Sequence, residues 1–148
     1  MRNNLNELVA HGSDTDLCDG VALLSADRFG DKIDVESTPH HCLTVDLIWA
    51  SYGIIENGGF QYLIESGFAG DSEFTRTANA YQAIGADAAI SAFQQLFLLF
   101  PNGVPRTSGA RERDYLKHGE EVRDRIDRKF FSASSQIVAC LAKYIRQH

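Results

Sequence analysis

Apolar residues recur three and four positions apart along most of the chain, and the alternation typical of strands is absent. The pattern therefore predicts helices, separated by short turns. The predicted helices cover residues 14–29, 39–57, 60–66, 72–84 and 87–100, a charged segment after residue 105, and a last segment from about residue 132. Residues 1–13 are expected to form a frayed or separately docked helix. We predict an all-α, compact, single-domain bundle of about six to eight helices spanning residues 1–148.

Two of these segments differ clearly in their polarity. Residues 43–55 carry many apolar side chains and few charges, which is typical of a central, buried helix. The segment after Pro105 is rich in charge and is predicted to be one amphipathic helix, with Tyr115, Val122 and Ile126 facing inward. The first segment is therefore expected to lie inside the bundle, and the second on its surface.

The composition predicts a globular, cytoplasmic protein. At 148 residues, with 44% hydrophobic and 23% charged residues, the chain has the size and balance of one folded domain. No apolar run approaches the roughly 18 residues that a membrane span needs, and the N-terminus lacks the apolar stretch of a secretory signal. The three cysteines, Cys18, Cys42 and Cys140, show no paired spacing. We expect reduced core thiols, with a reactive thiol as the alternative.

Charge is divided unevenly along the chain, whose formal net charge is -6. Residues 1–100 hold fourteen of the twenty acidic side chains and four of the fourteen basic ones, a net charge of -10. Residues 101–148 hold six acids and ten bases, a net charge of +4. Such asymmetry steers association with a partner of opposite sign, although two ordinary solvated faces would give the same totals.

No group of residues matches a known catalytic, cofactor or metal motif. His40 and His41 are adjacent and diverge by roughly 100° on a helix, so they do not form a metal-binding pair. Phosphate-binding loops, dinucleotide-binding glycine patterns, and metalloprotease or serine-hydrolase motifs are absent. We therefore predict no catalytic, cofactor-binding or metal-binding residues, and an enzyme of unrecognised class stays as an alternative.

Direct binding to nucleic acid or to a membrane is not expected either. Phosphate groups would repel the acidic first hundred residues. The basic part of the chain has five cations that could reach a phosphate backbone, but acidic side chains are interleaved with them. These cations are Arg111, Arg113, Lys117, Arg123 and Arg125.

One short segment, residues 57–62, combines two glycines with an aromatic residue in a way that predicts a tight helix–helix corner. Gly58 can end a helix in left-handed conformation, Gly59 allows a close approach, and Phe60 can fill the gap between two helices. The alternative is a binding role for the polar residues around the corner. These residues are Glu56, Asn57, Gln61 and Glu65.

Residues 57–60 resemble the NGGF motif of a bacterial all-helical family of mostly unknown function that includes a DNA-mimic protein. Four later stretches are similar to other motifs of this family, in the same order. They are Ala83-Ile84-Gly85-Ala86 at a short-helix junction, a Phe-Pro-x-Gly-x-Pro loop at 100–105, a Leu-Asp-x-x-Phe-Tyr-like stretch at 126–131, and the closing Tyr144-Ile145. In many members one residue separates the Phe from the following Gln-Tyr pair, whereas here Gln61 follows Phe60 directly. The difference rotates Gln61 and Tyr62 by roughly 100° on a helix.

The resemblance implies a helical fold and allows for a homodimer. For the characterised mimic it implies an acidic surface that occupies the DNA site of a transcription factor. Together with the charge division, it favours a non-enzymatic protein-interaction module whose acidic surface binds a basic DNA-binding protein. The candidate acidic surface comprises Asp14, Asp16, Asp19, Asp27, Asp31, Asp34, Glu36, Glu56 and Glu65. An immunity protein, antitoxin or adaptor with an apolar interface is the alternative, and its affinity would vary little with salt.

Overall fold

Seven helices make up most of the chain that the computed structural model describes, which is residues 9–10, 12–29, 39–66, 68 and 71–148. They are α2 (Asp14–Phe29), α3 (His40–Glu65), α4 (Thr75–Ala83), α5 (Asp87–Leu98), α6 (Ser108–Leu116), α7 (Glu120–Phe131) and α8 (Ser134–Gln147). No strand occurs within these described ranges. The prediction of an all-α bundle of six to eight helices is confirmed.

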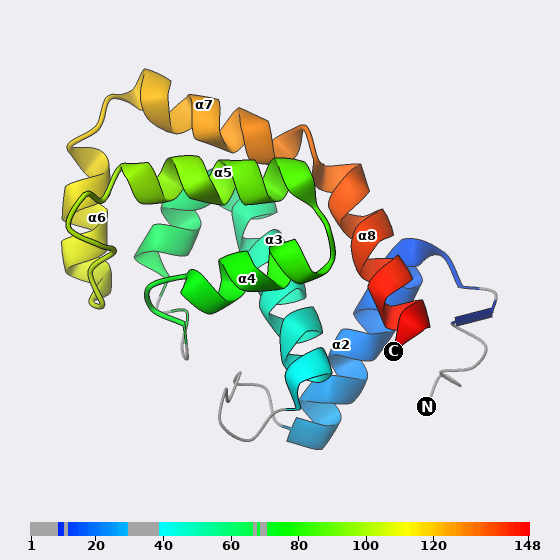
Figure 1. The fold of residues 1–148 in the computed structure, drawn as a ribbon. Coiled ribbons are helices and arrows are strands. Elements are labelled where there is room, and N and C mark those ends of the chain that lie inside the picture. The colour runs from blue at the N-terminus through cyan, green and yellow to red at the C-terminus, as the bar shows by residue number, and fades with distance from the viewer. Residues whose placement is uncertain (1–8, 11, 30–38, 67, 69–70) are drawn as a thin grey trace.

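Helix α3 is the longest element and contacts five others, namely α2, α4, α6, α7 and α8. Around it, α5 and α7 run side by side in opposite directions, α4 packs against α3 and α5, and α8 packs on α2 (Figure 1). The apolar segment 43–55 lies within α3, and Leu43, Leu47, Ile48 and Ile55 are buried. The sequence prediction of a central, buried helix is therefore correct.

Three boundaries differ at least in part from the prediction. The helices expected at 39–57 and 60–66 are present as the two halves of α3, and the predicted break is the non-helical backbone at Gly58 and Gly59; the difference is that the two halves follow each other as one kinked element. The charged segment after residue 105 is divided into α6 and α7, because the chain leaves the helix after Leu116 and restarts beyond Gly119. The apolar period does not continue across this break, so Val122 is 37% exposed although Tyr115 and Ile126 are buried.

The third difference lies at the start of α4, which begins at Thr75 instead of residue 72. The Asp71 carboxylate accepts the backbone N–H groups of Arg76 and Thr77 at 3.0 and 2.6 Å, and the Thr77 hydroxyl at 2.5 Å. Asp71 thereby satisfies free donors of the first helical turn and places negative charge at the positive end of the helix. The buried Asp71 therefore stabilises the start of α4.

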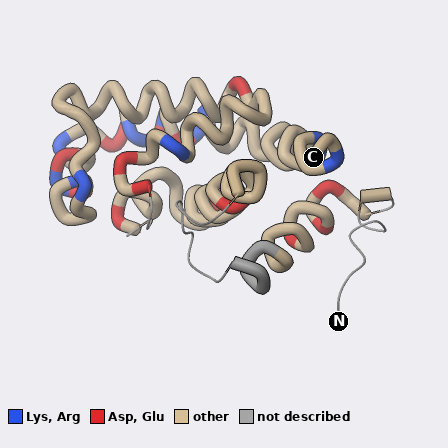
Figure 2. Tube along the Cα trace, turned by 60° about the horizontal axis from the view of Figure 1, so that its bottom comes forward, with Lys and Arg blue, Asp and Glu red and all other residues tan. Residues whose placement is uncertain are grey.

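Charged residues are distributed differently on the individual helices. The described part of α2 carries acidic positions and no basic ones, whereas acidic and basic positions alternate on α6 (Figure 2). Basic residues return near the end of α8, at Lys143 and Arg146. Among the first hundred residues, three of the nine acidic side chains that the structure describes therefore lie on α2, a helix at one side of the bundle, and the other six lie on α3, on α5 and in the loop before α4.

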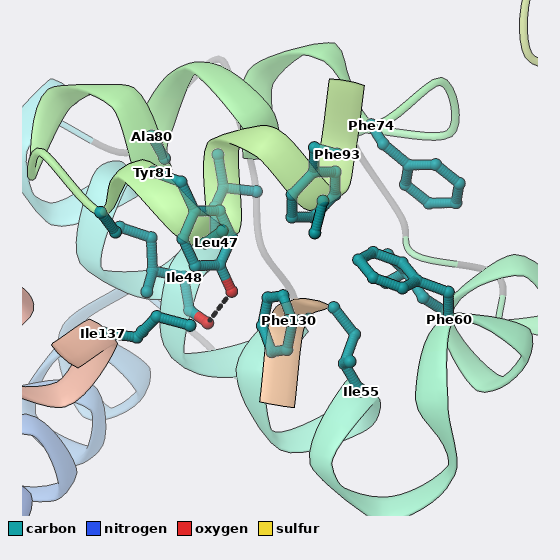
Figure 3. Packing of buried hydrophobic residues seen from close by; sticks show 14 of the residues in the cluster. Leu47, Ile48, Ile55, Phe60, Phe74, Ala80, Tyr81, Phe93, Phe130 and Ile137 are labelled. Carbon is teal, nitrogen blue, oxygen red and sulfur yellow. Dashed lines mark hydrogen bonds between the residues drawn. The ribbon is translucent and has the colours of Figure 1, made fainter. Parts of the chain in front are cut away.

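The core is built around four aromatic side chains from four helices (Figure 3). Phe60 of α3 lies edge-on to Phe93 of α5 and Phe130 of α7, with ring centroids 5.3 and 5.5 Å apart, and Tyr81 of α4 lies 5.2 Å from Phe93. The buried Tyr81 hydroxyl is 2.8 Å from the Ser51 hydroxyl, so its polar end is satisfied. Edge-on aromatic packing adds about 0.5–1.5 kcal/mol per pair to the stability gained by burial.

Candidate protein-interaction site

The kink in α3 is the point where the Asn-Gly-Gly-Phe segment determines the local structure. Gly59 has φ 71 and ψ -172, a combination that is nearly restricted to glycine. A Cβ atom at this position would also lie 2.5 Å from Oδ2 of Asp127 on α7. Glycine is therefore required at position 59 both by its backbone conformation and by the close approach of a neighbouring helix.

Asp127 caps the second half of α3 from another helix. Its Oδ1 accepts the backbone N–H of Phe60 at 2.9 Å, which satisfies one of the donors left free where the helix restarts. Burial raises the pKa of Asp127 above its ordinary value of 3.8, the Phe60 hydrogen bond acts in the opposite direction, and nearby Asp124 adds a smaller upward effect. Asp127 therefore has a clear structural role at the kink.

Phe60 continues this contact into the core, because its fully buried ring packs on Phe130 (Figure 3). The two segments 57–62 and 126–131, which the sequence resemblance singled out separately, therefore meet in space. The expected helix–helix corner is present, and Gly59 and Phe60 act in it as structural residues.

A polar rim surrounds the corner. Glu56, Asn57 and Glu65 are exposed, and Gln61 is half-buried. The Ser134 hydroxyl donates to the Glu56 carboxylate, and Gln61 Nε2 donates to Glu65 Oε1 at 2.8 Å. These polar residues lie at the surface, where a partner can reach them.

Gln61 also connects the rim to α7. The Arg123 guanidinium donates to Gln61 Oε1 at 3.5 Å and to the His118 carbonyl at 3.1 Å, and it lies 5.7 Å from the centroid of the Tyr115 ring. The Gln61 side chain therefore lies between a carboxylate on its own helix and a cation on the neighbouring helix. The Arg123 cation is held by groups of the protein itself.

Three of the predicted acidic residues lie on the described part of α2. Asp14 forms an ion pair with Arg146 of α8 at 2.9 Å, and Asp19 accepts the indole N–H of Trp49 at 2.8 Å. Asp16 is exposed, and Ser13 Oγ accepts its backbone N–H at 3.1 Å. Asp31, Asp34, Glu36 and the side chain of Asp27 lie outside the described residues.

An aromatic pair that the sequence analysis missed connects two of the predicted acids. Trp49, which donates to Asp19, stacks on Tyr52 with ring centroids 5.4 Å apart. The Tyr52 side chain lies near Ser134, whose hydroxyl donates to Glu56. Asp19 and Glu56 thus lie at the two ends of one continuous band, whereas Glu65 lies beyond the kink. The spacing of residues 49, 52 and 56 places them on one helix face, a signal that was available in the sequence.

Arg111 differs most from its sequence interpretation. It was one of the cations that could reach a nucleic acid, yet it is 1% exposed. Its guanidinium donates to five backbone carbonyls from three stretches of chain and lies 5.3 Å from the centroid of the Phe74 ring. The five acceptors belong to Ile64, Ser66, Ser72, Pro105 and Arg106. Arg111 is therefore a core residue that ties loops together, and nucleic acid has no access to it.

The three cysteine side chains are partly or fully shielded from solvent. Cys18 is buried, and desolvation together with Asp14 and Asp19 raises its pKa to about 12, so its reactive thiolate form is suppressed. Cys42 and Cys140 form no disulfide bond and are half-buried. Within the described residues, no three His, Cys, Asp or Glu side chains are grouped to hold a metal ion. Among the same residues, no helix is long and apolar enough to cross a membrane.

Comparison with known protein families identifies one family for most of the chain. Residues 36–148 match the model of the family described as DMP19-like protein. The chain belongs to the DMP19-like protein family. This membership confirms the resemblance to the DNA-mimic family that was inferred from the NGGF segment. No curated protein and no solved structure matches the chain.

The DMP19-like match covers the kink of α3 and its polar rim but does not cover the acidic residues of α2. Helices α3 to α8, with the kink and its rim, lie inside the matched region, whereas α2 lies before it. Asp14, Asp16 and Asp19 therefore belong to a segment outside the DMP19-like region. Glu56 and Glu65 lie inside that region.

Proposed function

We propose that this DMP19-like protein is a non-enzymatic interaction protein of the DNA-mimic type, whose acidic surface binds a basic DNA-binding protein. The supporting observation is that the described charged side chains of α2 are all negative. Between Asp14 and Leu24 the helix carries three carboxylates and no cation. In this proposal the partner is met in the bacterial cytoplasm, and Glu56 extends the surface onto α3.

Carboxylates suit this role because they can take the place of phosphate oxygens. Arg and Lys side chains that bind the DNA backbone form equally good charge-assisted hydrogen bonds with carboxylates. Asp14 and Asp19 are held in fixed orientations by Arg146 and Trp49, so little side-chain entropy is lost when a partner binds them. Opposite charge also accelerates the encounter with the partner, most strongly at low salt.

The test is capture of partners from bacterial lysate at low salt, with the full chain immobilised. The proposal expects a DNA-binding protein that is released by salt and displaced by added DNA. Asp16→Lys reverses an exposed charge in the first turn of α2, and Glu120→Lys makes the same change in the first turn of α7 as the matched control. Binding should weaken about tenfold for Asp16→Lys, as expected when like charges meet across an interface. Equal affinities for the two variants would exclude α2 as the binding surface.

A second candidate function, an adaptor with an apolar interface, is favoured by one observation. Leu98 on α5 is 79% exposed and Leu116 on α6 is 42% exposed. An interface centred on these leucines would hold its partner at high salt, because apolar contacts are not screened. Partners that resist a salt wash and are lost with Leu98→Ser would support this function over the mimic.

A further inference from the structure

Tyr62 is the residue at the corner whose position the core does not explain. Its ring is 53% exposed, whereas Phe60, two positions earlier, is fully buried and fills the gap between the helices. Tyr is enriched at protein interfaces because its side chain combines a large apolar ring with a polar hydroxyl. The Tyr62 ring is therefore available to a partner.

The exposed ring of Tyr62 packs on the backbone of Gly58. A Cβ atom at Gly58 would overlap the ring of Tyr62, which lies directly over the glycine backbone. Gly58 has φ -160, an extended value that any residue adopts, so its backbone conformation does not require glycine. The Tyr62 ring does require it. One face of the ring is thus fixed against the backbone, and the ring is pre-organised before any partner arrives.

Negative charge lies beside the ring. Glu65 follows Tyr62 by three residues, which places both on the same side of the helix, and Glu65 is exposed. Gln61 holds the Glu65 carboxylate through the hydrogen bond of 2.8 Å. The nearby cation, Arg123, is occupied by the His118 carbonyl, the Gln61 amide and the Tyr115 ring. The site therefore offers a flat aromatic surface and a carboxylate to a cation from outside.

We propose that Tyr62 and Glu65 form a docking site for an arginine side chain of a basic partner protein. This inference rests on the proposed function, because it assumes a partner rich in cations. Arginine fits better than lysine, since its planar guanidinium stacks on an aromatic ring while donating two parallel hydrogen bonds to a carboxylate. Within the interaction, the ring selects arginine and the acids of α2 supply the general attraction.

The test compares two fluorescein-labelled peptides of equal length, an oligoarginine and an oligolysine, binding to the full chain at low salt by fluorescence anisotropy. The wild type should bind oligoarginine more tightly. Tyr62→Ala should weaken oligoarginine binding about two- to fivefold, with a smaller loss for oligolysine. Tyr62→Phe keeps the ring and should retain the preference. Gly58→Ala displaces the ring without removing it and should lose the preference as Tyr62→Ala does.

The outcomes separate this inference from the proposed function. If Tyr62→Ala leaves the ratio of the two affinities unchanged while Asp16→Lys weakens both peptides, the docking site is wrong and the acidic surface stands. Failure of the wild type to bind either peptide would overturn both proposals. Circular dichroism of each variant checks that a changed affinity does not come from unfolding.

Discussion

Gly59→Ala is the substitution whose cost is best defined by the structure. The new side chain meets an unfavourable backbone conformation, with φ 71 and ψ -172, which costs about 1–3 kcal/mol. Its Cβ would also lie 2.5 Å from Asp127 Oδ2, so the carboxylate must move. That movement weakens the hydrogen bond from the Phe60 N–H, and such bonds to a charged group contribute about 1.5–3 kcal/mol. We expect a total loss of about 3 kcal/mol in the free energy of unfolding.

Urea unfolding followed by circular dichroism measures this loss, with Gly58→Ala as the matched control. At position 58 the backbone is extended and only the exposed Tyr62 ring must move, so the cost should stay below about 1 kcal/mol. In an Asp127→Ala background the crowding is already gone, and Gly59→Ala should then cost only its backbone part. Equal losses at positions 58 and 59, or an unchanged cost of Gly59→Ala without Asp127, would refute the reasoning.

Three further predictions concern Arg111, Asp127 and Cys18. Arg111→Met leaves five backbone carbonyls without their donor and should lower the free energy of unfolding by about 3–5 kcal/mol. A thermal melt would show this loss. A change below about 1 kcal/mol would contradict the structural role of Arg111. Because burial raises the pKa of Asp127, the folded state binds its proton more tightly than the unfolded state. The extra stability that this tighter proton binding gives is fully present below pH 3.8 and is lost as the pH rises through the folded pKa. Asp127→Asn should therefore gain stability relative to the wild type over this rise, as urea titrations at several pH values would show, and a relative loss would contradict it. In a variant carrying Cys42→Ser and Cys140→Ser, a maleimide should react with Cys18 only after unfolding, and rapid labelling of the native protein would contradict its burial.

The helical period was sufficient to predict most of the fold. Period and polarity depend on how side chains alternate around a helix, which is a local property, and this is why α3 and α5 were predicted as helices and α3 as central. Local signals also identified residues 57–60 as a corner, because two consecutive glycines have few other structural uses. The same period failed between Tyr115 and Val122, where a break at Gly119 changes the helix direction.

Tertiary structure decided the roles of the charged and polar residues. A sequence gives an arginine or an aspartate its charge but not its depth, which depends on residues far away in the chain. Arg111 was therefore counted among the possible nucleic-acid contacts although it donates to the carbonyls of Ile64, Ser66 and Ser72. Asp127 was noted only as part of the stretch 126–131, and its role required α7 to bring it to the amide of Phe60. The packing of the Tyr62 ring on Gly58 could likewise not be predicted from the sequence, because a sequence does not show which face of a ring is covered and which is open.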